Sequence, residues 1–206
     1  MSATASEKLF EKACEGLALS IRRIREASRP RPDYKVTLDV GALVVEVKQV
    51  GSNADDKERE WQLSTTGRSF GGVSLTRLRP LVAAANKQLR PWALRGIPTV
   101  VALYDPHPFQ LYTEDHHVRS LFGDIGISMP VHGHDHAAQD VVFARNQILS
   151  DRKNRSVSAV IAIREQFRAP IGLVLFHNPY SRIPLQHGCA ERLGMREVRY
   201  TFVPEE

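Results

Sequence analysis

The chain lacks the features that would assign it at once to several classes of protein. It has only two cysteines, Cys14 and Cys189, among 206 residues, which excludes a disulfide framework and, without a CxxC pair, a zinc ribbon. No apolar run is close to the length of about 18 residues that a membrane-spanning helix needs. Residues 1–16 are polar and lack the apolar core of a secretory signal. We therefore expect a reduced, cytoplasmic location.

Common nucleotide-binding motifs are absent as well. The sequence contains no Walker A motif and no GxGxxG, which argues against an NTPase or a dinucleotide enzyme. It shows no internal repeat and no low-complexity tract. With 42% hydrophobic and 25% charged residues, it has the composition of an ordinary globular protein, and its length favours one domain over residues 1–206.

Basic residues exceed acidic ones, 28 to 23, for a formal net charge of +5. A positive surplus makes a polyanion such as nucleic acid a plausible partner. Five of the cations lie within ten residues: Arg22, Arg23, Arg25, Arg29 and Arg31. They are candidate phosphate contacts, although a solvated helix end is an equally good interpretation.

Hydrophobic periodicity predicts most of the secondary structure. Apolar residues three and four apart predict helices over 6–27, with Ser6 as its N-cap, and over 74–95. Alternation predicts strands over 34–40 and 43–50, joined at Gly41 as an antiparallel hairpin. Residues 51–73 show no apolar period and are predicted as a long loop.

The remaining segments extend this pattern. We expect strands over 99–104, 156–164, 171–177 and 198–203 and a short helix over 114–122. The order predicts an α/β fold with a mixed sheet, in which an antiparallel hairpin is flanked by helices.

A polar group on the second predicted strand suggests chemistry. Glu46 and Lys48 are two residues apart, so their side chains leave the same face of an otherwise apolar strand. Burying either charge without a partner is costly. Asp33 begins the preceding strand and, across the hairpin, comes near both. Asp39 is closer to the turn and is the weaker candidate.

Two carboxylates and a lysine fit metal-assisted phosphodiester hydrolysis. Asp33 and Glu46 would bind Mg²⁺, or Mn²⁺ in its place, which keeps several water ligands and lowers the pKa of a bound water. Lys48 would orient that water or stabilise charge on the phosphate in the transition state.

The sequence Pro32-Asp33, the hairpin and Glu46-Val47-Lys48 resemble the PD-(D/E)xK nuclease superfamily. The resemblance covers about residues 6–104 and implies a restriction-endonuclease-like core there. Residues 105–206 lie outside the resemblance, and we expect them to extend the sheet. It implies that Asp33 and Glu46 ligate Mg²⁺ and that Lys48 is the catalytic lysine. It also implies an endonuclease acting on nucleic acid, with DNA favoured; dimerisation, which would serve cutting of both strands, stays open.

The superfamily often adds a glutamate from its first helix. Glu7, Glu11 and Glu15 are spaced for this, but they fall opposite the apolar stripe, which is typical of a solvated face. Lys87 and Gln88 could contact phosphate from the second long helix, although surface positions are the commoner explanation.

Two alternatives remain at this stage. The first is a catalytically silent nucleic-acid-binding or interaction domain of the same fold. The second is a zinc hydrolase, because His132, His134, Asp135 and His136 are similar to the HxHxDH motif of metallo-β-lactamase-like hydrolases. This stretch lacks one residue between the second histidine and the aspartate, and adventitious metal capture would also explain it.

Overall fold

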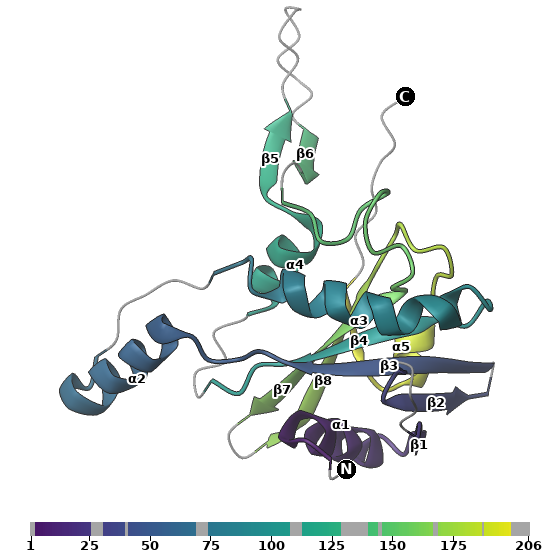
Figure 1. Ribbon diagram of the computed structural model, residues 1–206, viewed down its shortest axis with the longest axis horizontal. Coiled ribbons are helices and arrows are strands. Elements are labelled where there is room, and N and C mark those ends of the chain that lie inside the picture. The colour runs from purple at the N-terminus through teal and green to yellow at the C-terminus, as the bar shows by residue number, and fades with distance from the viewer. Residues whose placement is uncertain are drawn as a thin grey trace, which may run out of the picture.

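A seven-stranded mixed sheet with helices on both faces forms the centre of the protein (Figure 1). The computed structural model describes residues 3–25, 31–39, 41–68, 74–107, 113–128, 140–143, 146–166, 169–186 and 188–198. The predicted α/β class with a mixed sheet is therefore confirmed. Among the helices described, none is long and apolar enough to cross a membrane.

The sheet has the order β1-β2-β3-β4-β7-β8-β9. β1 to β3 are antiparallel, β3, β4 and β7 are parallel, β8 is antiparallel to β7, and β9 is parallel to β8. Its strands are β1 (Ser20–Arg23), β2 (Tyr34–Leu38), β3 (Gly41–Gln49), β4 (Thr99–Tyr104), β7 (Ala159–Gln166), β8 (Ala169–His177) and β9 (Arg196–Val198). A separate ribbon pairs β5 (Ile125–Ser128) with β6 (Asp140–Phe143).

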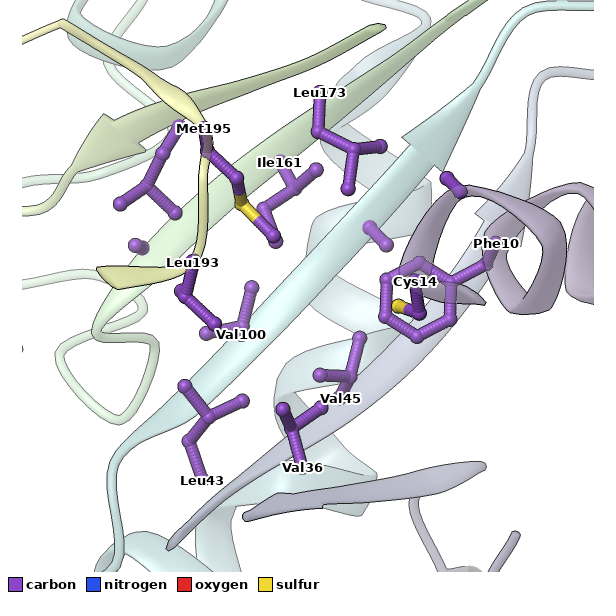
Figure 2. Packing of buried hydrophobic residues seen from close by; sticks show 14 of the residues in the cluster. Phe10, Cys14, Val36, Leu43, Val45, Val100, Ile161, Leu173, Leu193 and Met195 are labelled. Atoms are coloured by element: carbon purple, nitrogen blue, oxygen red, sulfur yellow. The ribbon is translucent and has the colours of Figure 1, made fainter. Parts of the chain in front are cut away.

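Each face of the sheet has its own hydrophobic core. On one face, α1 (Ala5–Gly16) packs Phe10 and Cys14 against Val45 and its neighbours (Figure 2), and α5 (Cys189–Arg192) covers the same side. On the other face lie α3 (Leu78–Ala93) and α4 (Glu114–Phe122). The side chains of β3 alternate between the two cores, so Val45 and Val47 face α1 whereas Val44 faces α3.

The first helix is shorter than its apolar period predicted. α1 ends at Gly16, and Ser20–Arg23 forms the edge strand β1, with Ile21 opposite Val36. The helix prediction over 17–25 was therefore wrong, because the spacing of Leu17 and Ile21 also fits a turn followed by a strand, and residues 26 and 27 of that prediction lie outside the described residues. The N-cap is Thr4 rather than Ser6, and it forms a capping box with Glu7.

The predicted loop over 51–73 contains a helix, α2 (Ala54–Thr66). Asn53 caps its N-terminus in a capping box with Asp56, and Gly67 ends it in a left-handed conformation with φ of 68°. The loop prediction was wrong because it relied on an apolar stripe. Asp56 is the one buried residue of α2, so this helix has no such stripe.

The other predicted elements agree with the structure within a few residues. The hairpin, the long helix beginning near 78, the strand over 99–104 and the helix over 114–122 are all present. The strand predicted over 156–164 begins at Ala159, and the last strand is described over Arg196–Val198. Residues 199–203 and the cluster at 132–136 lie outside the described residues.

Candidate functional site

Asp33 immediately precedes β2, and beyond this point β3 no longer pairs with β2. Tyr34 pairs with Val45, which places Asp33 beside Glu46. The Oδ2 of Asp33 accepts a hydrogen bond of 2.8 Å from the backbone N–H of Val47. The carboxylate thus replaces the strand carbonyl that would otherwise satisfy this donor, and it fixes the side chain at the open edge of β3.

Glu46 is a buried carboxylate that accepts one hydrogen bond of normal geometry, from Lys48, and has the amide of Gln88 nearby. It is 1% exposed, and its Oε1 accepts a hydrogen bond of 2.5 Å from Nζ of Lys48. Oε2 is buried and receives no hydrogen bond of normal geometry from the described residues. A buried oxygen without a partner is costly, and this one lies where an additional ligand could satisfy it.

Burial and neighbouring charges shift the pKa values of both carboxylates. Burial, followed by the negative charge of Asp33, raises the pKa of Glu46 to about 7, although Lys48 and the amide of Gln88 favour its charged form. Burial, together with the charge of Glu7, also raises the pKa of Asp33 against the opposing effects of the Val47 N–H and Lys48. Burial is the largest cause of both shifts.

These side chains line one cleft of about 460 Å³. The cleft opens at the sheet edge, between the N-terminus of α1 and the flank of α3. Its lining combines carboxylates, cations and an amide: Glu7, Arg23, Arg31, Asp33, Glu46, Lys48 and Gln88 are among the residues that form it. The three residues of the predicted site thus share one cavity.

Glu7 belongs to this cleft, contrary to the prediction of a solvated face. Its side chain is 8% exposed and pairs with Arg23 at 2.8 Å. The prediction failed because it placed residues 20–23 on the helix, whereas β1 folds back and brings Arg23 to α1. Glu11 instead accepts a hydrogen bond of 2.7 Å from the hydroxyl of Tyr34, and Glu15 is exposed. Neither lines the cleft.

The predicted basic residues have different environments. Arg31 lines the cleft, Arg23 is paired with Glu7, and Arg22 and Arg25 are exposed. Arg29 lies outside the described residues. The surface interpretation of Gln88 was wrong, because its amide lies beside Glu46 and donates to the carbonyl of Arg31 at 3.3 Å.

The cleft has the donors for a hard cation but does not present a finished ligand set. The described part of the chain contains no group of three or more histidine, cysteine, aspartate or glutamate side chains arranged to hold a metal ion. The unpartnered Oε2 of Glu46 and the nearby carboxylate of Asp33 nevertheless fit Mg²⁺, which uses one or two carboxylates and completes its shell with water.

A second buried polar group lies beyond the end of β4, and no spacing in the sequence had indicated it. Nε2 of His107 is 3.0 Å from Asp56, and its Nδ1 contacts Asp105. Arg77 contacts both oxygens of Asp56, at 3.0 and 2.7 Å. Burial opposes ionisation of Asp56, but the Asn53 N–H and Arg77 hold its pKa below the ordinary value. Both oxygens of Asp56 and both ring nitrogens of His107 are engaged, so the network joins α2 to the segment after β4, whereas Oδ2 of Asp105 is buried without a hydrogen-bond partner among the described residues.

Comparison of the chain with protein-family models, with curated proteins and with solved structures gave no match.

Proposed function

We propose that the protein is a Mg²⁺-dependent phosphodiesterase that acts on nucleic acid, with DNA as the favoured substrate, and that its core has a restriction-endonuclease-like fold. The order α1, β2–β3 hairpin, α3 and β4 supports this proposal, since it is the order that the PD-(D/E)xK resemblance implies. The convergence of Asp33, Glu46 and Lys48 in one cleft supports it further.

One observation carries the proposal. Glu46 has an unpartnered oxygen on a side chain that is only 1% exposed, next to a second carboxylate and a lysine. Such an arrangement destabilises the scaffold, and active sites are where such costs are found. A structural Glu–Lys pair would require neither Asp33 nor an open cleft beside it.

The residues would divide the work as follows. Asp33 and Glu46 would hold the cation, which when bound polarises a phosphate oxygen and lowers the pKa of a water ligand. Lys48, whose side chain is 25% exposed, reaches from Glu46 toward the cleft opening. Its ammonium would orient the attacking water or stabilise charge accumulating on the phosphate. Both carboxylates sit on or beside a strand, which keeps them rigid.

The arginines would bind the substrate rather than take part in the chemistry. Arg31 lines the cleft, and exposed Arg22 and Arg25 extend the positive charge along the neighbouring edge. Arg23 is paired with Glu7. Cations in this arrangement suit phosphate contacts, which supply most of the sequence-independent affinity for nucleic acid.

The ion pairs of the cleft favour one alternative, a binding domain of the same fold without catalytic activity. Lys48 pairs with Glu46, and Arg23 pairs with Glu7. If these pairs persisted in the presence of Mg²⁺, the carboxylates would be unavailable as ligands, and the protein would bind nucleic acid without cutting it.

The decisive experiment separates metal binding from cleavage. Wild type, Lys48→Ala and Glu46→Gln are compared for Mn²⁺ binding by calorimetry and for cleavage of linear, supercoiled and single-stranded DNA and of RNA. We expect Lys48→Ala to retain metal binding but to lose about 10²-fold or more in cleavage, because the ammonium is not a ligand. Glu46→Gln should lose metal affinity.

Lys12→Ala, which changes an exposed lysine of α1, is the matched control and should cut like wild type. Equal cleavage by wild type and Lys48→Ala would show that the site is assigned incorrectly. Metal binding and DNA binding without any cleavage would support the silent domain instead.

A further inference from the structure

The two faces of the edge hairpin β1–β2 carry opposite charge. Arg23 lies opposite Tyr34 in the β1–β2 ladder, and both side chains contact glutamates of α1. Side chains alternate along a strand, so the next pair in the ladder, Arg22 and Lys35, points to the other face. Lys35 also lies opposite Val44 of β3, which belongs to the core under α3.

The α1 side of this hairpin is acidic. Glu7, Glu11 and Glu15 follow one another along the flank of α1 that meets β1 and β2. Arg23 is the one cation of the described residues lining the cavity between Glu11 and Glu15, and it is already paired with Glu7. A polyanion would be repelled from this side.

The opposite side carries the cations Arg22 and Lys35, with the carboxylate of Asp33 two residues before Lys35. Arg22 is exposed, Lys35 is half-buried, and neither forms an ion pair within the described part of the chain. Like charges directly opposite each other on neighbouring strands destabilise a sheet. A ligand that carries negative charge would relieve this repulsion, whereas a purely structural role offers no reason for it.

Both positive side chains lie on the face from which Glu46 and Lys48 also project. Glu46 and Lys48 are two and four residues after Val44 on β3, so their side chains project from the same face as that of Val44. Gln88 of α3 donates to the Arg31 carbonyl from this side. Arg22 and Lys35 therefore lie on the same face of the sheet as Glu46 and Lys48. Figure 1 shows the two helices on opposite sides of the sheet, α1 below and α3 above β3.

We infer that the sugar-phosphate backbone of the nucleic acid crosses the β1–β2 hairpin on its α3 side, contacts Arg22 and Lys35 there, and enters the cleft past Arg31. This inference rests on the proposed function, because it concerns how the substrate of that cleft is oriented. It goes further by assigning Lys35, which no motif indicated, to binding, and by excluding the α1 side from the path.

The test measures binding of a short fluorescein-labelled DNA duplex in EDTA by anisotropy, over a range of salt concentrations. We expect Arg22→Gln and Lys35→Gln each to reduce the slope of log affinity against log salt by about 0.9, the value for one phosphate contact. Lys12→Gln removes the same charge from an exposed position of α1 and should leave the slope unchanged.

A second measurement separates binding from structure. Thermal unfolding of Lys35→Gln should occur at the same temperature as that of wild type or higher, because the repulsion with Arg22 is removed. A lower unfolding temperature with an unchanged salt slope would overturn the inference. It would also be overturned if wild type failed to bind the duplex at low salt, or if Lys12→Gln altered the slope as much.

A third measurement distinguishes failure of this inference from failure of the proposed function. Mn²⁺ binding and hydrolysis of bis(p-nitrophenyl) phosphate, which is too small to reach the hairpin, test the proposed chemistry in wild type, and Lys12→Gln should leave both unchanged. One outcome is that wild type neither binds Mn²⁺ nor hydrolyses the phosphodiester, while Arg22→Gln and Lys35→Gln still weaken DNA binding. In that case the proposed chemistry fails but the binding path stands. If wild type binds Mn²⁺ and hydrolyses the phosphodiester, but neither Arg22→Gln nor Lys35→Gln weakens DNA binding, the binding path fails and the proposed chemistry stands.

Discussion

The substitution Glu46→Gln should remove a pH dependence of the unfolding free energy that the buried Glu46 carboxyl creates in wild type. Burial and Asp33 raise the pKa of Glu46 to about 7 from its ordinary value of 4.5. The folded protein therefore holds this proton more tightly than the unfolded chain does. The stabilisation is complete below the unfolded pKa of 4.5 and is lost as the pH rises through about 7.

The size of the effect follows from the interval between the two pKa values. Each pH unit in which only the folded state holds the proton is worth about 1.4 kcal/mol. Over the interval from 4.5 to about 7, this amounts to on the order of 3 kcal/mol. Because the amide in Glu46→Gln does not titrate, the variant should gain up to this amount over wild type between about pH 5 and about pH 8.

Urea unfolding followed by circular dichroism, in metal-free buffer at several pH values, measures the difference between the two proteins directly. Asp33 and other groups titrate in both proteins, so their contributions largely cancel. Glu15→Gln, at an exposed position of α1, is the control and should follow wild type at every pH. A stability difference between Glu46→Gln and wild type that does not change with pH would refute the reasoning.

Two further predictions concern residues around the cleft and the network beyond it. Gln88→Ala removes an amide that favours the charged form of Glu46, so the pH midpoint of Mn²⁺ binding, measured by calorimetry, should rise. The control Lys87→Ala, at an exposed position, should leave this midpoint unchanged. An unchanged midpoint in Gln88→Ala would contradict the contact between Gln88 and Glu46. Asp56→Ala leaves Arg77 and His107 without their shared carboxylate and should lower the unfolding free energy by about 3–5 kcal/mol. The control Asp55→Ala, at the exposed neighbouring position, should change it by about 0.5 kcal/mol or less. Similar urea midpoints for the two variants would show that the network contributes little to stability.

The elements with a clear hydrophobic period could be predicted from the sequence. Strand alternation located the hairpin, and the rule that residues two apart share a face placed Glu46 beside Lys48. The position of Asp33 followed from the same ladder. These inferences needed only local geometry, which the sequence specifies directly.

The errors arose where one pattern suits two structures or where no pattern exists. Leu17 and Ile21 fit a continuous helix as well as a turn and an edge strand, and the helical interpretation concealed the approach of Arg23 to Glu7. α2 has no apolar stripe, because nearly all of it faces solvent. The contact of His107 with Asp56 joins residues far apart in the chain, so no periodicity could reveal it.

The topology around β3 also determines the order in which the site can assemble during folding. The hairpin β2–β3 closes through a short turn, so Asp33, Glu46 and Lys48 can meet early. The parallel pairing of β3 with β4 joins Val44 to Thr99 and must wait for closure of a much longer segment. We therefore expect Glu46 to remain hydrated when the hairpin forms and to lose its water when β4 and α3 pack against it. A folding step that desolvates a carboxylate is slower when the carboxylate is charged. We accordingly expect the folding rate to decrease as the pH rises from 4.5 towards about 7 and to level off above that range.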